Sequence, residues 1–127
     1  MVAFRCYISA EGSNVIRQWY DGSPEELKGA LDGLLDVLGL TPRKYWRLPG
    51  FRKLTGPCCG LCALRLKVEE VHHRVLGFDG PAADAFTLLH PFKKRDDPDY
   101  SKSGPIGHAR KDQVIAYEHH SRECRFP

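Results

Sequence analysis

The chain lacks long hydrophobic runs. No apolar stretch approaches the roughly 18 residues that a membrane-spanning helix needs, and the N-terminal MVAFRCYISAEG has no basic segment followed by an apolar one. We therefore expect a soluble, cytoplasmic protein with no membrane partner. The sequence also lacks internal repeats, a P-loop, a dinucleotide-binding glycine fingerprint and a serine-nucleophile elbow. No organic cofactor is expected.

Cysteine is present in an odd number. The five cysteines are Cys6, Cys58, Cys59, Cys62 and Cys124, and a chain of 127 residues can build a core without disulfides. We expect all five thiols to be reduced. The CCGLC segment suggests zinc, with Cys6 or a histidine as a further ligand, but the second half of the usual paired spacing is missing. The sequence therefore predicts no bound metal.

The size and hydrophobic content of the chain predict one domain over residues 1–127, because 42% hydrophobic residues supply a single core. The net charge of +3 is unevenly distributed. Residues 1–42 contain three basic and six acidic side chains, whereas residues 43–127 contain 16 basic and 10 acidic ones. An anionic partner should therefore contact the second region.

Hydrophobic periodicity predicts an α+β fold. Expected strands span residues 2–9, 61–68, 71–78 and 85–92, and expected helices begin at Asn14, at Ser23 as N-cap and at Pro105. The apolar side of the last helix should contain Ile106, Ala109, Val114 and Tyr117. This order predicts a small antiparallel sheet with two N-terminal helices and a C-terminal helix, all on one face of the sheet.

Two of the expected strands form a hairpin around Glu69 and Glu70. If these glutamates make a two-residue turn, Arg65 lies opposite Arg74, and Lys67 lies opposite His72. Like charges directly across a sheet are destabilising, so an anion between them would explain the arrangement. Salt bridges from the two arginines to nearby acidic residues are the alternative.

Residues 41–60 are expected to form a loop that is rich in cations around Tyr45, Trp46 and Phe51. Basic residues interleaved with aromatic ones suit a nucleic-acid surface, because cations neutralise phosphate and rings stack on bases. Trp46 and Phe51 could equally anchor the loop to the core while the charges face solvent. The sequence leaves both interpretations open.

The segment LLHPFKKR ends the last expected strand with a cationic cluster. Strand alternation predicts that Phe86, Leu88, His90 and Phe92 share one face. His90 is either a structural histidine within the core or a catalytic group with a near-neutral pKa. Lys93 and Lys94 either keep the end of the strand soluble or bind an anion.

Several segments together resemble the RelE/HigB-like toxins of bacterial and phage toxin–antitoxin modules. The resemblance covers about two thirds of the chain, and the matching segments occur in the same order as in the family. The matching segments are Lys53-Leu54-Thr55-Gly56, Gly60-Leu61-Cys62-Ala63-Leu64-Arg65, His73-Arg74-Val75-Leu76, Leu88-Leu89-His90-Pro91-Phe92-Lys93-Lys94 and Ile106-Gly107-His108-Ala109-Arg110.

This resemblance implies a RelE-like fold and a metal-independent, ribosome-dependent mRNA endoribonuclease. Its partners would be the ribosome, mRNA and a cognate antitoxin, expected to be a helix-turn-helix protein. The implied catalytic residues are Arg65, Arg74, His90 and Lys93, and the implied RNA-binding residues are Lys53, Lys67, Lys94, Arg95 and Tyr100. Cleavage of this kind needs a base, a leaving-group acid and cations that stabilise charge on the phosphate.

A non-enzymatic relative is the alternative, either a gyrase-directed toxin of the related ParE group or an inactive phage protein. Ala63 and His73 stand where the family pattern has glutamate and tyrosine, and these departures favour the alternative. For Tyr100, stacking on an RNA base and ordinary loop packing are both open. We expect Arg65, Arg74 and Lys93 to converge on one solvent-accessible surface.

Overall fold

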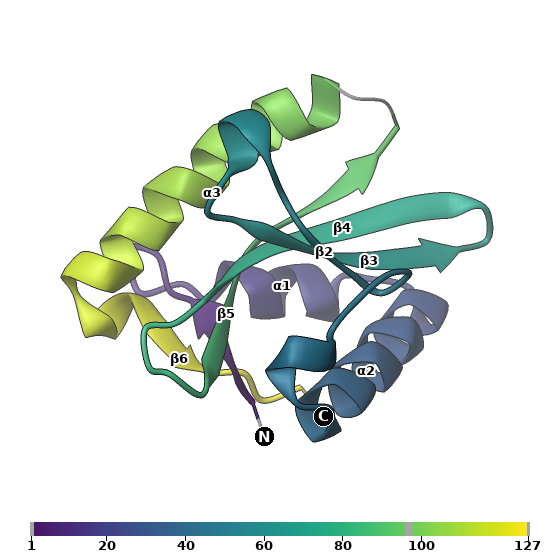
Figure 1. The fold of residues 1–127 in the computed structure, drawn as a ribbon, viewed down its shortest axis with the longest axis horizontal. Coiled ribbons are helices and arrows are strands. Elements are labelled where there is room, and N and C mark those ends of the chain that lie inside the picture. The colour runs from purple at the N-terminus through teal and green to yellow at the C-terminus, as the bar shows by residue number, and fades with distance from the viewer. Residues whose placement is uncertain (1, 96–97, 127) are drawn as a thin grey trace.

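The computed structural model describes residues 2–95 and 98–126 and arranges them in three layers. A six-stranded sheet separates α1 and α2 on one face from α3 on the other (Figure 1). The helices are α1 (Val15–Asp21), α2 (Glu25–Leu40) and α3 (Pro98–Ala116). The strands are β1 (Ala3–Tyr7), β2 (Phe51–Lys53), β3 (Cys62–Val68), β4 (Val71–Asp79), β5 (Ala85–Lys94) and β6 (Ser121–Glu123). Three short 3₁₀ helices are η1 (Arg43–Tyr45), η2 (Gly56–Cys58) and η3 (Glu118–His120).

The predicted α+β class is confirmed, but the sheet is mixed rather than antiparallel. Its strand order is β2-β3-β4-β5-β1-β6, and β1 runs parallel to β5 with Ala3 opposite Ala85. The expectation that all helices lie on one face is also wrong. Leu64 belongs to the core under α1 and α2, whereas its neighbour Ala63 belongs to the core under α3. Strands with apolar residues on both faces need a helix layer on each side.

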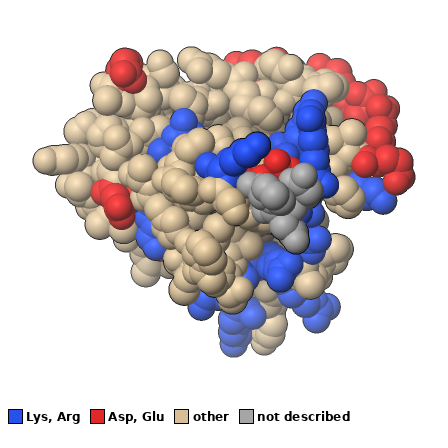
Figure 2. Space-filling view, turned by 90° about the horizontal axis from the view of Figure 1, so that it is seen from above, with Lys and Arg blue, Asp and Glu red and all other residues tan. Residues whose placement is uncertain are grey.

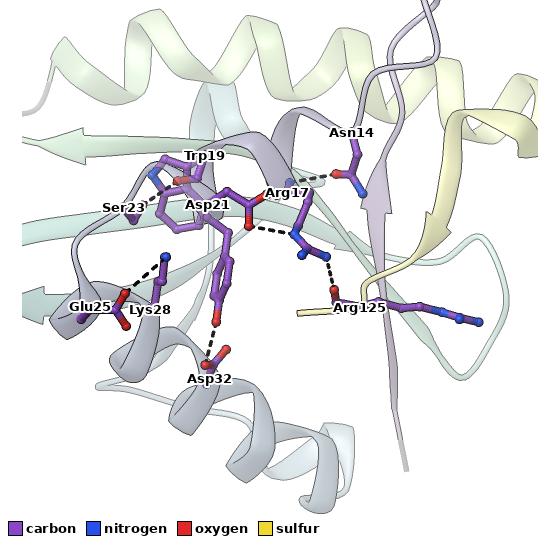
Figure 3. Close-up of polar contacts among 10 residues, drawn as sticks. Asn14, Arg17, Trp19, Asp21, Ser23, Glu25, Lys28, Asp32 and Arg125 are labelled. Atoms are coloured by element: carbon purple, nitrogen blue, oxygen red, sulfur yellow. Dashed lines mark hydrogen bonds and ion pairs between the residues drawn. The ribbon is translucent and has the colours of Figure 1, made fainter. Parts of the chain in front are cut away.

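The two N-terminal helices begin differently from each other. In α1, Asn14 caps the first turn, since its Oδ1 accepts a hydrogen bond from the Arg17 backbone N–H at 2.9 Å (Figure 3). Ser23 does not cap α2, contrary to expectation, because its hydroxyl donates to the Trp19 carbonyl at 2.6 Å. Pro24 occupies the N-cap position, and Glu25 and Glu26 place negative charge in the first turn.

Helix α3 is longer than predicted, because Pro105 lies inside it rather than at its start. Small residues face the sheet: a Cβ on Gly107 would lie 3.0 Å from Leu61 Cδ1 and 3.1 Å from Leu76 Cδ1. Val114 is buried as expected, whereas Ile106, Ala109 and Tyr117 are exposed. Close approach of backbone to sheet therefore sets the buried face of α3. None of the helices in the described part of the chain is long and apolar enough to cross a membrane.

The C-terminal residues add β6 to the free edge of β1. This pairing brings Cys124 beside Cys6, and the two form a disulfide with Cα atoms 5.2 Å apart. The prediction that every thiol is reduced is therefore wrong for this pair, while Cys58, Cys59 and Cys62 are free. The bonded residues are 118 positions apart, a proximity that local sequence patterns do not reveal.

Part of the expected loop 41–60 is strand β2, which pairs with β3. Trp46 and Phe51 are buried in the core under α2, so these two rings anchor the segment. The Trp46 indole N–H donates to the Leu38 and Thr41 carbonyls at 3.0 and 2.9 Å. Tyr45 remains exposed beside them.

Candidate functional site

A two-residue turn fixes the register of the hairpin that carries the arginines. Glu69 and Glu70 have φ angles of 49° and 66°, the left-handed conformation of the turn that suits hairpin twist. Arg65 lies opposite Arg74, and Lys67 lies opposite His72, as predicted. The two arginines therefore share one face of the sheet.

That face is the one covered in part by α3. Ala63 and Leu76 pack in the core under α3, and strand alternation places Arg65 and Arg74 on the same side. Arg52 joins them because it pairs with Ala63. We call this group the cationic face; its members are Arg52, Arg65, Lys67, His72, Arg74 and Lys94.

The cationic face lies beyond the part of the sheet that α3 covers. In Figure 1 the β3–β4 hairpin extends past the start of α3. Figure 2 shows Lys and Arg side chains gathered on this side of the molecule, around the junction between β5 and α3. A hollow of about 330 Å³ lies beside the β3–β4 hairpin and is lined by Pro49 and Gly50 together with Arg65, Lys67, His72 and Arg74, among others.

Arg74 is the most unusual residue of the site, since it is only 4% exposed. Its Nη1 donates to the His73 carbonyl at 3.0 Å, but its buried Nε has no hydrogen-bond partner. Among the described residues, neither Arg74 nor Arg65 forms an ion pair with a carboxylate. Leaving a buried charged donor unpaired is costly, and an anion bound beside the two guanidinium groups would offset part of that cost.

The second guanidinium adds to this positive potential. Partial burial and then the neighbouring Arg74 lower the pKa of Arg65 from its ordinary value, with a smaller contribution from Arg52 in the same direction. Tyr100 acts in the opposite direction. Within residues 2–95 and 98–126, Arg65 and Arg74 make no salt bridge to a carboxylate, whereas Lys67 does pair with Glu70 at 3.2 Å.

Aromatic rings border the cationic face. The His90 and Phe92 rings stack with centroids 6.0 Å apart, and Phe92 meets Tyr100 edge-on at 5.3 Å. The Lys94 ammonium lies 5.3 Å from the centroid of the Tyr100 ring. Rings beside guanidinium groups form a surface on which unpaired bases could stack.

A β-bulge in β5 brings His90 and Phe92 to this side. Leu76 pairs with His90, but the next residue, Gly77, pairs with Leu88, so Leu89 is an extra residue in the strand. The bulge reverses the alternation, and the prediction that Phe86 and Leu88 share a face with His90 and Phe92 is wrong. Gly77 accommodates the irregularity, since a Cβ there would lie 2.4 Å from a Phe86 ring carbon.

His90 is neutral near pH 7. Burial and then the Arg110 charge lower its pKa to about 4. Its Nδ1 faces the Arg110 guanidinium at 3.3 Å, and because arginine only donates, Nδ1 must accept. The same guanidinium nitrogen donates to the Leu89 carbonyl at 2.9 Å. In this state His90 is neither a cationic acid nor a base at Nδ1.

Two expected site residues lie on the other face. Lys93 pairs with His73 and lines a hollow with Trp19 and Leu27, so the predicted convergence of Lys93 with Arg65 and Arg74 is wrong. Lys53 pairs with Cys62, which belongs to the core under α1 and α2.

The remaining expected residues lie near the predicted surface. Lys67 and Lys94 belong to the cationic face and Tyr100 borders it, while Arg95 lies just past the end of β5, where its backbone N–H donates to the Asp99 carboxylate. Sequence reasoning missed Arg52, because the strand that orients it was taken for a loop. It did not assign His72 to the site, although the predicted register already placed that residue opposite Lys67.

The cysteines and histidines outside this surface do not converge on a metal site. Among residues 2–95 and 98–126, no group of three or more His, Cys, Asp or Glu side chains has an arrangement that could hold a metal ion. Cys58 instead donates to the Tyr100 carbonyl at 3.8 Å, and burial raises the pKa of its thiol.

We found no protein-family model that matches this chain and no curated protein with significant sequence similarity to it.

Proposed function

We propose that this protein is a RelE/HigB-like toxin that binds mRNA on the ribosome and cleaves it without a metal ion. The observation that carries the proposal is the buried Arg74, whose unpartnered Nε lies beside the like-charged Arg65. A bound phosphate would neutralise the charge of both guanidinium groups. The neighbouring Phe92 and Tyr100 rings favour RNA over a small inorganic anion, because they offer stacking surfaces.

In the proposed reaction, the 2′-hydroxyl of the RNA attacks the adjacent phosphate. As the O–P bond to the following nucleotide breaks, the 2′-hydroxyl gives its proton to a water molecule and the departing 5′-oxygen takes a proton from water. Arg65 and Arg74 would stabilise the charge that develops on the phosphate oxygens. The neutral, hydrogen-bonded His90 would hold Arg110 and the aromatic rings in position rather than transfer a proton.

The protein would act in the cytoplasm, where translating ribosomes present mRNA, and a small helix-turn-helix antitoxin would keep it inactive. A neighbouring reading frame that encodes such a protein would support this assignment. The RelE-like fold is part of the same proposal. The three-layer α+β arrangement is consistent with such a fold.

The test is cleavage of mRNA on translating ribosomes by the purified protein. Enzyme that was treated with EDTA to remove metal ions is compared with untreated enzyme. We expect products with a 5′-hydroxyl and a 2′,3′-cyclic or 3′-phosphate end. Arg65→Gln should lower the cleavage rate by about 100-fold, the range seen when one preorganised charge-stabilising donor is removed. Lys53→Gln, on the opposite face, is the matched control and should leave the rate within about twofold of the wild type.

Products with a 5′-phosphate, or a rate unaffected by Arg65→Gln, would contradict the mechanism. A second candidate is a non-enzymatic partner-binding toxin, and the neutral state of His90 is the observation that favours it. Growth inhibition without any mRNA cleavage would support that candidate.

A further inference from the structure

A second hollow, of about 450 Å³, lies where the turn between α1 and α2 faces the hairpin end of β3 and β4 and the end of β5. Its size is in the range of pockets that hold small molecules. Leu27 and Val68 contribute apolar walls, and Trp19 packs beside them against the core that contains Leu31 and Leu66. The hollow therefore lies on the α1 and α2 side of the sheet, away from the cationic face.

His73 is the buried polar residue of this hollow. Its partner on β5 is Lys93, and the two side chains share one face of the sheet. His73 is only 7% exposed, yet no group in the described part of the chain hydrogen-bonds to its ring nitrogens. The rings of His90, His108 and His120 all have such partners. Because buried polar groups are normally hydrogen-bonded, this imidazole points to a ligand in the hollow.

The charges around the hollow define the kind of ligand. Burial and then the charges of Lys93 and Arg74 lower the pKa of His73, so its imidazole is neutral near pH 7 and offers one N–H donor. Lys93 adds an ammonium group, and the exposed Glu26 and Glu69 also line the hollow. Within residues 2–95 and 98–126, none of these three charged side chains forms a salt bridge. One negative charge on the ligand suits this set, whereas the two carboxylates would repel a doubly charged anion.

We propose that this hollow binds a small molecule with one carboxylate and an aromatic body. The carboxylate would accept hydrogen bonds from the Lys93 ammonium and the His73 imidazole, and the aromatic body would lie against Trp19 and the apolar walls. The turn that carries Trp19 is already ordered, because the Ser23 hydroxyl donates to the Trp19 carbonyl at 2.6 Å (Figure 3). Such order lowers the entropic cost of binding. The proposal does not depend on the proposed ribonuclease activity.

The test titrates the isotope-labelled full chain with phenylacetate and follows backbone amide shifts together with the ring shifts of His73. Two comparison probes are the neutral phenylacetamide and phenyl phosphate, which is doubly charged well above its second pKa of about 6. We expect phenylacetate to shift amides of residues 18–27 and 68–73. It should bind at least about tenfold more tightly than either comparison probe, because only phenylacetate carries a single negative charge.

Lys93→Gln should weaken phenylacetate binding by at least about tenfold, because a charge-assisted hydrogen bond is lost. Lys93 is exposed, so this variant keeps the core intact. Lys44→Gln removes an exposed lysine of η1 outside the hollow; it is the matched control and should bind like the wild type. His73→Phe keeps a ring but removes the donor, and it should also weaken binding, with urea denaturation to check that it is folded.

The proposal is overturned if phenylacetate fails to bind at millimolar concentration. It is also overturned if phenylacetamide or phenyl phosphate binds as tightly as phenylacetate, or if Lys93→Gln binds phenylacetate like the wild type.

Discussion

The two faces of the sheet are built from the same strands but differ in how completely helices cover them. On the face under α1 and α2, apolar residues continue toward the hairpin end, where Leu66 packs against Leu27 and Leu31. On the face under α3, Ala63 and Leu76 are part of the apolar core. The next residues of β3 and β4 on the same face, toward the hairpin turn, are Arg65 and Arg74.

Polar groups on the two faces differ in the same way. On the α1 and α2 side, the Tyr20 hydroxyl donates to Asp32 at 2.8 Å, and burial together with this carboxylate raises the pKa of Tyr20 to about 12. On the α3 side, the Arg74 Nε has no partner. One face therefore has the features of a stable core, whereas the other retains a buried guanidinium nitrogen without a hydrogen-bond partner.

The largest effect is expected for Arg74→Met, which replaces a buried charge by an apolar side chain of similar length. We expect RNA binding and cleavage to fall by at least about 100-fold, because the buried donor is lost. The free energy of unfolding should stay unchanged or rise by about 1 kcal/mol, because an unpaired buried charge and a like-charge contact disappear. Cleavage assays and urea denaturation measure the two effects.

A variant with lower stability and intact RNA binding would reverse this assignment and make Arg74 a structural residue. Arg74→Ala is a less informative change, because truncation of a side chain that is only 4% exposed also leaves a cavity. The expectation that this arginine is exposed was wrong, and the methionine variant separates loss of charge from loss of volume.

The second prediction concerns the α1 and α2 side, where Cys6 lies in the core and Cys124 packs against it. Replacing both cysteines by alanine should lower the free energy of unfolding by about 2–4 kcal/mol, because the disulfide restricts the unfolded chain. RNA binding at a temperature where the variant is folded should not change. Intact mass before and after thiol alkylation establishes that the wild-type bond is present.

If the double variant were as stable as the wild type with its disulfide intact, the disulfide would not stabilise this side of the molecule. Reduction of the wild type with a dithiol should reproduce the stability of the variant, which provides an internal check.

The smallest expected effect is a pH dependence that arises from His90. Its pKa of about 4 lies below the unfolded value of about 6.5, so between these pH values the unfolded chain binds more protons. Its contribution to stability is complete above about pH 6.5 and is lost as the pH falls toward 4, by roughly 2 kcal/mol after allowance for partial exposure. His73, whose burial also lowers its pKa, adds a dependence of the same sign.

His90→Gln should flatten this part of the stability profile, because the amide oxygen can still accept from Arg110 but does not titrate. His119→Gln, at an exposed position, is the matched control. Denaturation midpoints between pH 4 and pH 7 give the profile, and a slope that is equal in wild type and His90→Gln would contradict the assignment.

The local elements follow from the amino-acid sequence alone. The apolar stripe of α2, the Asn14 cap and the two-residue turn at Glu69 and Glu70 depend on residues close together in the chain. Because strand side chains alternate with a period of two, the turn also fixed the pairing of Arg65 with Arg74.

Which side chains lie together on each face of the sheet depends on the tertiary structure. The extra residue Leu89 moved His90 to the α3 face and left Lys93 on the other, and β2 placed Arg52 rather than Lys53 beside Arg65. The burial of Arg74 and the Cys6–Cys124 bond likewise depend on segments distant in sequence. Turns and periodicities follow from short-range sterics, whereas bulges, burial and long-range pairing follow from packing of the whole chain, which no short window of sequence contains.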